Sequence, residues 1–184
     1  MSQPWTVKSV PVAVLLLVTG FVLDAVTIVH TYEHMVEVFA PASTKDDSMN
    51  GSVAVLYTWG VGALSLLVMG LSTVLLCTAV VGLLRDRPWG RTLALVVFVP
   101  NALFTAVALP AFGWRDRAAL DPNDLSAYFD PATTPPVVRF ADVADVPFGF
   151  AGAVGGLLLL VVPASRRWYE RRRSAEAPEP VSAR

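Results

Sequence analysis

Asp24 is the ionised side chain that lies deepest inside a long apolar stretch of this sequence, within residues 10–29. A carboxylate at the centre of a lipid bilayer costs about 2.5–3.5 kcal/mol on insertion scales, and such residues commonly serve a proton or ion pathway. Thr27 and Thr31 follow three and seven positions later. That spacing puts all three side chains on one face of a helix, so a polar stripe is expected there.

Two polar residues of another apolar stretch, Asn101 and Thr105, are expected at a depth comparable with that of Asp24. Either of them could donate a hydrogen bond to the carboxylate. Asp24 could then relay a proton or a cation, or it could be a protonated or hydrogen-bonded acid that fixes the register between helices. Pumps usually string several ionisable groups across the bilayer and these stretches hold one, so we favour the structural role and keep transport as the alternative.

The segment from His30 to His34 reads His-Thr-Tyr-Glu-His and matches the His-x-x-Glu-His pattern of a class of zinc peptidases. Histidines four residues apart share a helical face, and Glu37 one turn later could supply a third metal ligand. The chain has no room for the soluble catalytic domain of such a peptidase. The remaining interpretations are a metal site at the outer face of the membrane and an ordinary interfacial helix end. Two histidines from one helix cannot clamp a haem from opposite sides.

Four apolar stretches must position these side chains. Only 16% of the 184 residues are charged, against about 25% in a typical soluble domain. A helix needs about 20 apolar residues to cross a ~30 Å hydrocarbon layer. The spans are expected at residues 10–29, 60–84, 92–112 and 146–164. We therefore predict an all-α, four-helix transmembrane bundle as a single domain over residues 1–173, followed by a disordered cytoplasmic tail at 174–184.

Most lysines and arginines lie near the two termini or in the turn between the second and third spans. Because cytoplasmic segments of membrane proteins are enriched in these residues, both termini are predicted to be cytoplasmic. The loops at residues 31–52 and 113–145 are then outside. Five arginines after the last span are expected to bind lipid headgroups or, alternatively, a cytoplasmic partner, with Trp168 and Tyr169 among the headgroups. These arginines are Arg166, Arg167, Arg171, Arg172 and Arg173.

Two local patterns add detail to this architecture. Gly152 and Gly156 form a GxxxG pair, which allows another helix to approach closely. In the second outer loop, Asp121 and Pro122 are typical of a helix start, and a short amphipathic helix over residues 122–129 is expected to rest on the membrane surface.

The turn between the second and third spans reads Gly-Leu-Leu-Arg-Asp-Arg-Pro-Trp-Gly-Arg from Gly82 to Arg91. Together with the Leu/Val/Ala-rich spans and the preference for Arg over Lys, it resembles a set of small four-span membrane proteins of actinobacteria. The resemblance implies a bacterial plasma-membrane location. No shared activity is known for that set, so it implies no site residues.

Several functions are excluded by what the sequence lacks. Its lone cysteine, Cys77, cannot form an intramolecular disulfide or a CxxC redox pair. It contains no phosphate-binding loop, no nucleophile elbow, no dinucleotide fingerprint and no basic–aromatic nucleic-acid surface. We predict no enzymatic activity, no cofactor and no nucleic-acid partner.

The predicted function is that of a polytopic integral membrane protein, a non-enzymatic accessory or interaction subunit in the lipid bilayer. It would work by packing small-residue helix faces against a membrane-protein partner or a second copy of itself. One alternative is a small proton- or ion-coupled transporter that uses Asp24. The other is an outer-face metal-binding protein that uses His30 and His34.

Overall fold

The computed structural model describes residues 4–34, 49–112, 134–163, 165 and 167–170. All regular secondary structure in this part of the chain is helical. The elements are α1 (Trp5–Lys8), α2 (Val10–His34), α4 (Met49–Leu84), α5 (Pro88–Phe112) and α6 (Pro136–Val161).

In the described part of the chain, four helical segments are long and apolar enough to cross a membrane, which confirms the all-helical, four-span part of the prediction. They are Trp5–His30, Trp59–Leu84, Pro88–Val107 and Pro136–Val161. The short loop helix expected over residues 122–129 lies outside the described residues.

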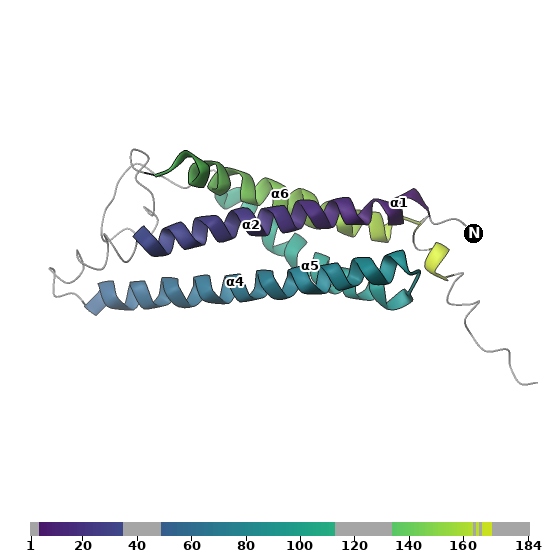
Figure 1. Cartoon of the computed structure of the whole chain (residues 1–184), viewed down its shortest axis with the longest axis horizontal. Helices are drawn as coiled ribbons and strands as arrows, with labels where there is room; N and C mark the ends of the chain where they lie inside the picture. Colours follow the sequence, from purple (N-terminus) through teal and green to yellow (C-terminus); the bar gives the residue numbers. More distant parts are fainter. Residues whose placement is uncertain (1–3, 35–48, 113–133, 164, 166, 171–184) are drawn as a thin grey trace, which may run out of the picture.

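The most extensive contact in the bundle joins α2 to α6, the first and last spans. Helix α5 packs against α6 and α4, and a smaller contact between α4 and α2 completes the arrangement. Figure 1 shows the start of α1 and the segment after α6 at the same end of the bundle. We call this the terminal end, and we call the opposite end, where α2 stops and α6 starts, the loop end.

The packed interior holds side chains from all four spans, among them Leu17, Leu76, Phe98 and Leu160, each with none of its surface exposed. Large apolar side chains also cover the outer surface of the bundle. Phe104 and Val107, for example, are 74% and 78% exposed. In water such a surface would be unfavourable, but lipid tails are as apolar as the side chains themselves. The distribution therefore supports a multi-pass membrane protein.

A tight turn joins α4 to α5 at the terminal end. Asp86 takes the left-handed conformation there, with φ 58°, which Asp tolerates better than most residues. The backbone N–H of Arg87 donates to the carbonyl of Gly82 at 2.8 Å, so the last turn of α4 is closed before Pro88 begins α5. A Cβ at Gly90 would lie 2.7 Å from the carbonyl carbon of Gly82, and only glycine allows the two helices this spacing.

The last span starts earlier than its charge pattern suggests. The sequence places its start at residue 146 and the preceding residues in an outer loop, whereas α6 begins at Pro136. Arg139, Asp142 and Asp145 are therefore helical rather than part of a loop. The physical reason is that both acids are buried in the helical bundle, whereas the large apolar side chains Val137, Phe140 and Val143 are exposed.

Candidate functional site

Buried acidic side chains gather in the half of the α2–α6 interface nearest the loop end. On α6, Asp142 is 2% exposed and Asp145 is 8% exposed. Thr27 on α2 is also 8% exposed, and Asp24 is half-buried. Carboxylates are rarely this buried without hydrogen-bonding or ionic partners, and each of these acids has such an interaction. We call Asp24, Thr27, Asp142 and Asp145 the acidic cluster.

The register between α2 and α6 follows from two close backbone contacts. A Cβ built on Gly20 would lie 2.7 Å from the backbone nitrogen of Gly149 and 3.0 Å from the carbonyl oxygen of Asp145. Leu17 lies against Gly152 in the same way, one turn nearer the terminal end. Because the two helices run in opposite directions, one turn further toward the loop end brings Asp24 level with Asp145. Thr27 is then level with Asp142, so two helices combine their polar residues in one place.

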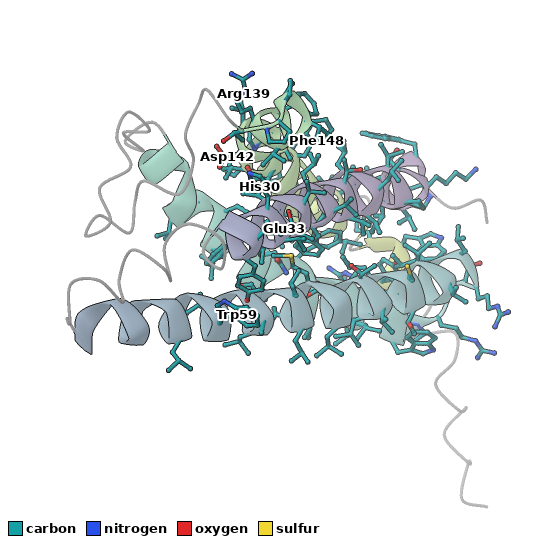
Figure 2. All side chains as sticks on the ribbon, turned by 60° about the vertical axis from the view of Figure 1, so that its left-hand side comes forward. His30, Glu33, Trp59, Arg139, Asp142 and Phe148 are labelled. Carbon is teal, nitrogen blue, oxygen red and sulfur yellow. The ribbon has the colours of Figure 1, made fainter. Side chains whose placement is uncertain are left out.

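The histidine end of α2 lies beside this cluster. Figure 2 shows His30 and Glu33 on α2 near Asp142 on α6, with Arg139 pointing away from the bundle. The Nδ1 atom of His30 is 3.9 Å from Oε2 of Glu33, and the side chain of Glu33 is 68% exposed. This contact is an ion pair only when His30 is protonated, and one so exposed contributes little to stability. The loop end therefore combines buried acids with an exposed ionisable rim.

The expected contribution of α5 takes a different form. The side-chain amide of Asn101 donates to the carbonyl of Val97 at 2.8 Å, and the Thr105 hydroxyl donates to the carbonyl of Asn101 at 2.8 Å. Both groups thus satisfy hydrogen bonds within their own helix. A Cβ built on Gly149 would lie 3.5 Å from the Thr105 methyl. Helix α5 therefore borders the acidic cluster one turn toward the terminal end. The side chain of Thr31 lies outside the described residues.

The proposed metal ligands are only partly described. The side chain of His34 and the whole of Glu37 lie outside the described residues, so a site formed with His30 stays a prediction. Within the described residues, no group of three or more His, Cys, Asp or Glu side chains could hold a metal ion. The acidic cluster can exchange a proton or fix helix register, and these are the chemistries its geometry supports.

Between the acidic cluster and the terminal end, the described spans are free of strongly ionisable groups. In the described spans, no Asp, Glu, His, Lys or Arg lies between the level of Asp24 and that of Lys8 and Arg91 near the terminal end. The interior over this distance is formed by apolar residues such as Leu17, Phe98 and Ala153, all fully buried. A proton entering from the loop end would therefore meet no side-chain relay through this stretch.

The two glycines of the GxxxG pair contact different helices. A Cβ on Gly152 would meet the backbone of Leu17 on α2, 2.7 Å from its Cα. A Cβ on Gly156 would meet the ring of Phe98 on α5. The pair thus brings α6 close to α2 at one level and accommodates a large aromatic ring of α5 one turn further along. The sequence alone did not indicate that the partners differ.

A second polar group of residues lies at the terminal end. The hydroxyls of Thr6 and Ser165 are 2.6 Å apart and buried, and they tie the start of the chain to the segment after α6. The Ser165 hydroxyl is also 2.7 Å from the carbonyl of Leu159, to which it donates. Arg91 donates through Nη2 to the carbonyl of Leu160 at 3.2 Å. These bonds join α1, α5 and the end of α6.

Trp168 and Tyr169 pack into this end of the bundle rather than lying at its surface. They are 8% and 5% exposed, and their rings meet edge to face with centroids 4.8 Å apart. The guanidinium carbon of Arg91 lies 5.2 Å from the centre of the Tyr169 ring, within range of a cation–π contact. Burial raises the pKa of the Tyr169 hydroxyl to about 12, with Arg91 opposing the shift and Asp86 adding to it.

Of the arginines expected to bind headgroups, Arg167 is described and exposed.

Helix α4 leaves one whole face without a neighbour among the described residues. Exposed residues recur on it at alternating spacings of four and three, opposite the side that packs on α5. This α4 stripe consists of Leu56, Gly60, Ala63, Leu67, Gly70, Val74, Cys77 and Val81. At the loop end, α4 contacts α2 through Trp59, whose ring stacks on Tyr32 at 4.9 Å and whose carbonyl accepts the Tyr32 hydroxyl at 2.6 Å. Because its residues are exposed in the described part of the chain, the α4 stripe is free for another molecule.

Comparisons with protein-family models, curated proteins and solved structures found no match to this chain. The class of protein follows from the fold alone: an all-helical, multi-pass membrane protein with four candidate spans.

Proposed function

We propose that this chain is a non-enzymatic interaction subunit of a bacterial plasma membrane, with both termini in the cytoplasm. The orientation is supported by the basic residues that gather at the terminal end, including Lys8, Arg85, Arg87 and Arg91. The bacterial location is supported by the resemblance of the turn from Gly82 to Arg91. The interaction role is supported by the unoccupied face of α4.

The α4 stripe is the observation that carries this proposal, and a second copy of the chain is the partner that fits it. Alternating spacings of three and four define the seam of a left-handed helix pair. The stripe contains no charge, and Gly60 and Gly70 have nothing within 4 Å of an added Cβ. Small residues on a helix surface let a neighbouring backbone approach closely in a membrane. In a parallel pair, each stripe residue would face its own equivalent.

The lone cysteine provides the test, because Cys77 is exposed and belongs to the stripe. Mild oxidation of native membranes should convert most of the protein into a disulfide-linked dimer through Cys77, and Cys77→Ser should abolish it. In the Cys77→Ser background, Leu67→Cys should restore the dimer. Val68→Cys should not, because the next residue points about 100° away around the helix.

Leu67 and Val68 are 66% and 50% exposed, so exposure alone does not distinguish the two variants. Non-reducing electrophoresis of membranes gives the readout. Equal cross-linking at both positions, or none at Cys77 and Leu67→Cys, would remove the dimer.

A second candidate function is proton- or ion-coupled transport through the acidic cluster. It is favoured by the finding that Asp142 and Asp145 of α6 lie opposite Asp24, which gives three carboxylates where the sequence suggested one. The absence of an ionisable relay below the cluster in the described spans is what places it second. In such a protein the acids would take up the proton or cation on the loop side, and helix movement would have to open a route past the apolar interior.

Asp24→Asn tests this second candidate because it removes the charge and keeps the shape. If the protein is a transporter, an ion gradient should change the internal pH of proteoliposomes that contain the wild type but not of those that contain Asp24→Asn. The thermal stability of the variant should stay near that of the wild type. Glu33→Gln is the matched control, since Glu33 is exposed at the same end and should be neutral. A wild type without flux, or an Asp24→Asn variant with unchanged flux, would eliminate transport.

A further inference from the structure

Two buried hydrogen-bonding atoms at the terminal end have no partner among the described residues: Nε of Arg91 and the hydroxyl of Tyr169. Nearly all buried polar atoms in folded proteins are hydrogen-bonded, and an exception calls for an explanation such as an ion or ligand. A guanidinium Nε can only donate, and a phenol can donate as well. Two donors without acceptors, on residues that touch each other, indicate a ligand that carries acceptor oxygens.

The surrounding contacts hold both residues in place. Nη2 of Arg91 is engaged by the carbonyl of Leu160, and its guanidinium lies over the Tyr169 ring. The ring of Trp168 packs edge to face on Tyr169. Arg91 is therefore oriented by contacts that leave its Nε edge unused. An oriented guanidinium is well suited to bind planar or tetrahedral oxyanions.

The charge at this end favours an anion. Arg85, Arg87 and Arg167 are exposed around the site, and Asp86 is the nearby acid. The 25-residue helix α5 begins at Pro88, so the positive end of its dipole points to the same region. Trp5 and Trp89 are 70% and 46% exposed, and indole rings prefer the headgroup layer of a membrane. The site therefore lies where phosphate groups of lipids are most concentrated.

The segment that carries Tyr169 is separated from α6 by a break in the helix. Helix α6 ends at Val161, and Val162 takes an extended conformation with ψ 139° before Pro163. Both unpartnered atoms are buried, so a ligand reaches them only when this segment moves and the hydrogen bonds of Ser165 to Thr6 and Leu159 break.

We propose that Arg91 and Tyr169 form a binding site for a phosphate group, supplied by an anionic phospholipid of the adjacent leaflet. The phosphate oxygens accept hydrogen bonds from Nε of Arg91 and from the Tyr169 hydroxyl. The lipid chains lie along the apolar surface of the bundle. This inference does not depend on dimerisation through α4 or on transport.

The test uses the full-length protein purified in a zwitterionic detergent, with phosphatidylglycerol as the probe and phosphatidylcholine as the neutral reference. Binding is counted by native mass spectrometry, and thermal unfolding is followed in parallel. Phosphatidylglycerol should bind preferentially and raise the Tm of the wild type. Tyr169→Phe and Arg91→Gln should each weaken its binding by about tenfold or more, as expected for the loss of a charge-assisted hydrogen bond.

Lys8→Gln is the control, because it removes one positive charge from an exposed side chain at the terminal end and should leave binding near the wild-type level. Three results would overturn the proposal as stated. If Lys8→Gln lost as much binding as Arg91→Gln, surface charge rather than a site would be responsible. If Tyr169→Phe had the same lowered Tm with phosphatidylglycerol as with phosphatidylcholine and still preferred to bind phosphatidylglycerol, the Tyr169 hydroxyl would not contact the lipid. Water would then satisfy the two donors. If inorganic phosphate raised the Tm and phosphatidylglycerol did not, the source would be a soluble phosphate rather than a lipid.

Discussion

Replacing Gly152 with leucine should prevent the bundle from assembling, whereas the same replacement at Gly155 should leave it intact. A Cβ at position 152 would already lie 2.7 Å from the Cα of Leu17, and a leucine adds three more carbons. The obstacle is backbone, so no rotamer change relieves the overlap and α2 must separate from α6. Overpacking of ordinary cores costs about 1–3 kcal/mol, and we expect more here because the clash is with a main chain. A typical protein has only about 5–15 kcal/mol of stability to lose.

Gly155 is the internal control, since a Cβ there has nothing within 4 Å. It has the same residue type on the same helix, three residues away, so helix propensity and hydrophobicity change equally in both variants. Size-exclusion chromatography in mild detergent and thermal unfolding provide the measurements. A Gly152→Leu protein that elutes and unfolds like Gly155→Leu would contradict the close α2–α6 contact.

Alkaline pH should destabilise the protein through Tyr169. Its pKa is raised from 10.0 to about 12 in the folded state by burial, so the folded protein keeps the proton that the unfolded chain releases. The stabilisation is fully present below pH 10 and is lost as the pH rises toward 12, because only the unfolded state ionises in that window. At about 1.36 kcal/mol per pKa unit, the full loss is roughly 2–3 kcal/mol.

Tyr169→Phe should remove this component of the pH dependence because phenylalanine does not titrate. The measurement is the free energy of unfolding in detergent at several pH values from 8 to about 11.5, and the result is the difference between the two proteins. We expect the variant to gain stability relative to the wild type as the pH rises. A constant difference between the two over this range would show that Tyr169 ionises as readily in the folded protein as in the unfolded chain.

The spans could be predicted because one physical requirement dominates them. Hydrocarbon excludes charge, so ionised side chains avoid the stretches that become helices, and this pattern requires no knowledge of neighbours. The second span illustrates the accuracy: it was expected at residues 60–84, and the membrane-crossing part of α4 is Trp59–Leu84. Trp59 marks the boundary because indole rings prefer the interface.

The start of α6 and most of the acidic cluster could not be predicted by the same reasoning. Asp142 and Asp145 look like loop residues when only charge is counted. Their helical character is visible in the apolar residues that recur every three positions around them, Val137, Phe140 and Val143, which are exposed while the acids are buried. The buried face of this part of α6 thus carries the two acids together with Val138, Ala141 and Ala144, while its large apolar side chains are exposed, unlike those of a soluble helix.

The partners of individual side chains depend on which helices are neighbours, and the sequence constrains that weakly. A short turn requires α4 and α5 to be adjacent, but nothing local indicates that α2 packs on α6. For that reason the sequence left Asn101 as a possible donor to Asp24, whereas its amide donates to the carbonyl of Val97 in its own helix. Trp168 and Tyr169 were similarly expected among the headgroups. The sequence does not show the break after α6 or the packing beside Arg91, on which their burial depends.

The most extensive contact in the bundle joins α2 to α6, the first and the last of the four described spans in chain order. During translation the α4–α5 hairpin can form as soon as both of its helices have left the ribosome, because they are joined by a short turn. Helix α2 must wait in the bilayer until α6 emerges, with the face around Leu17 and Gly20 lacking its permanent neighbour. A nascent chain stalled before Pro136 would therefore carry an unmatched helix, a feature that chaperones or proteases of the membrane could recognise.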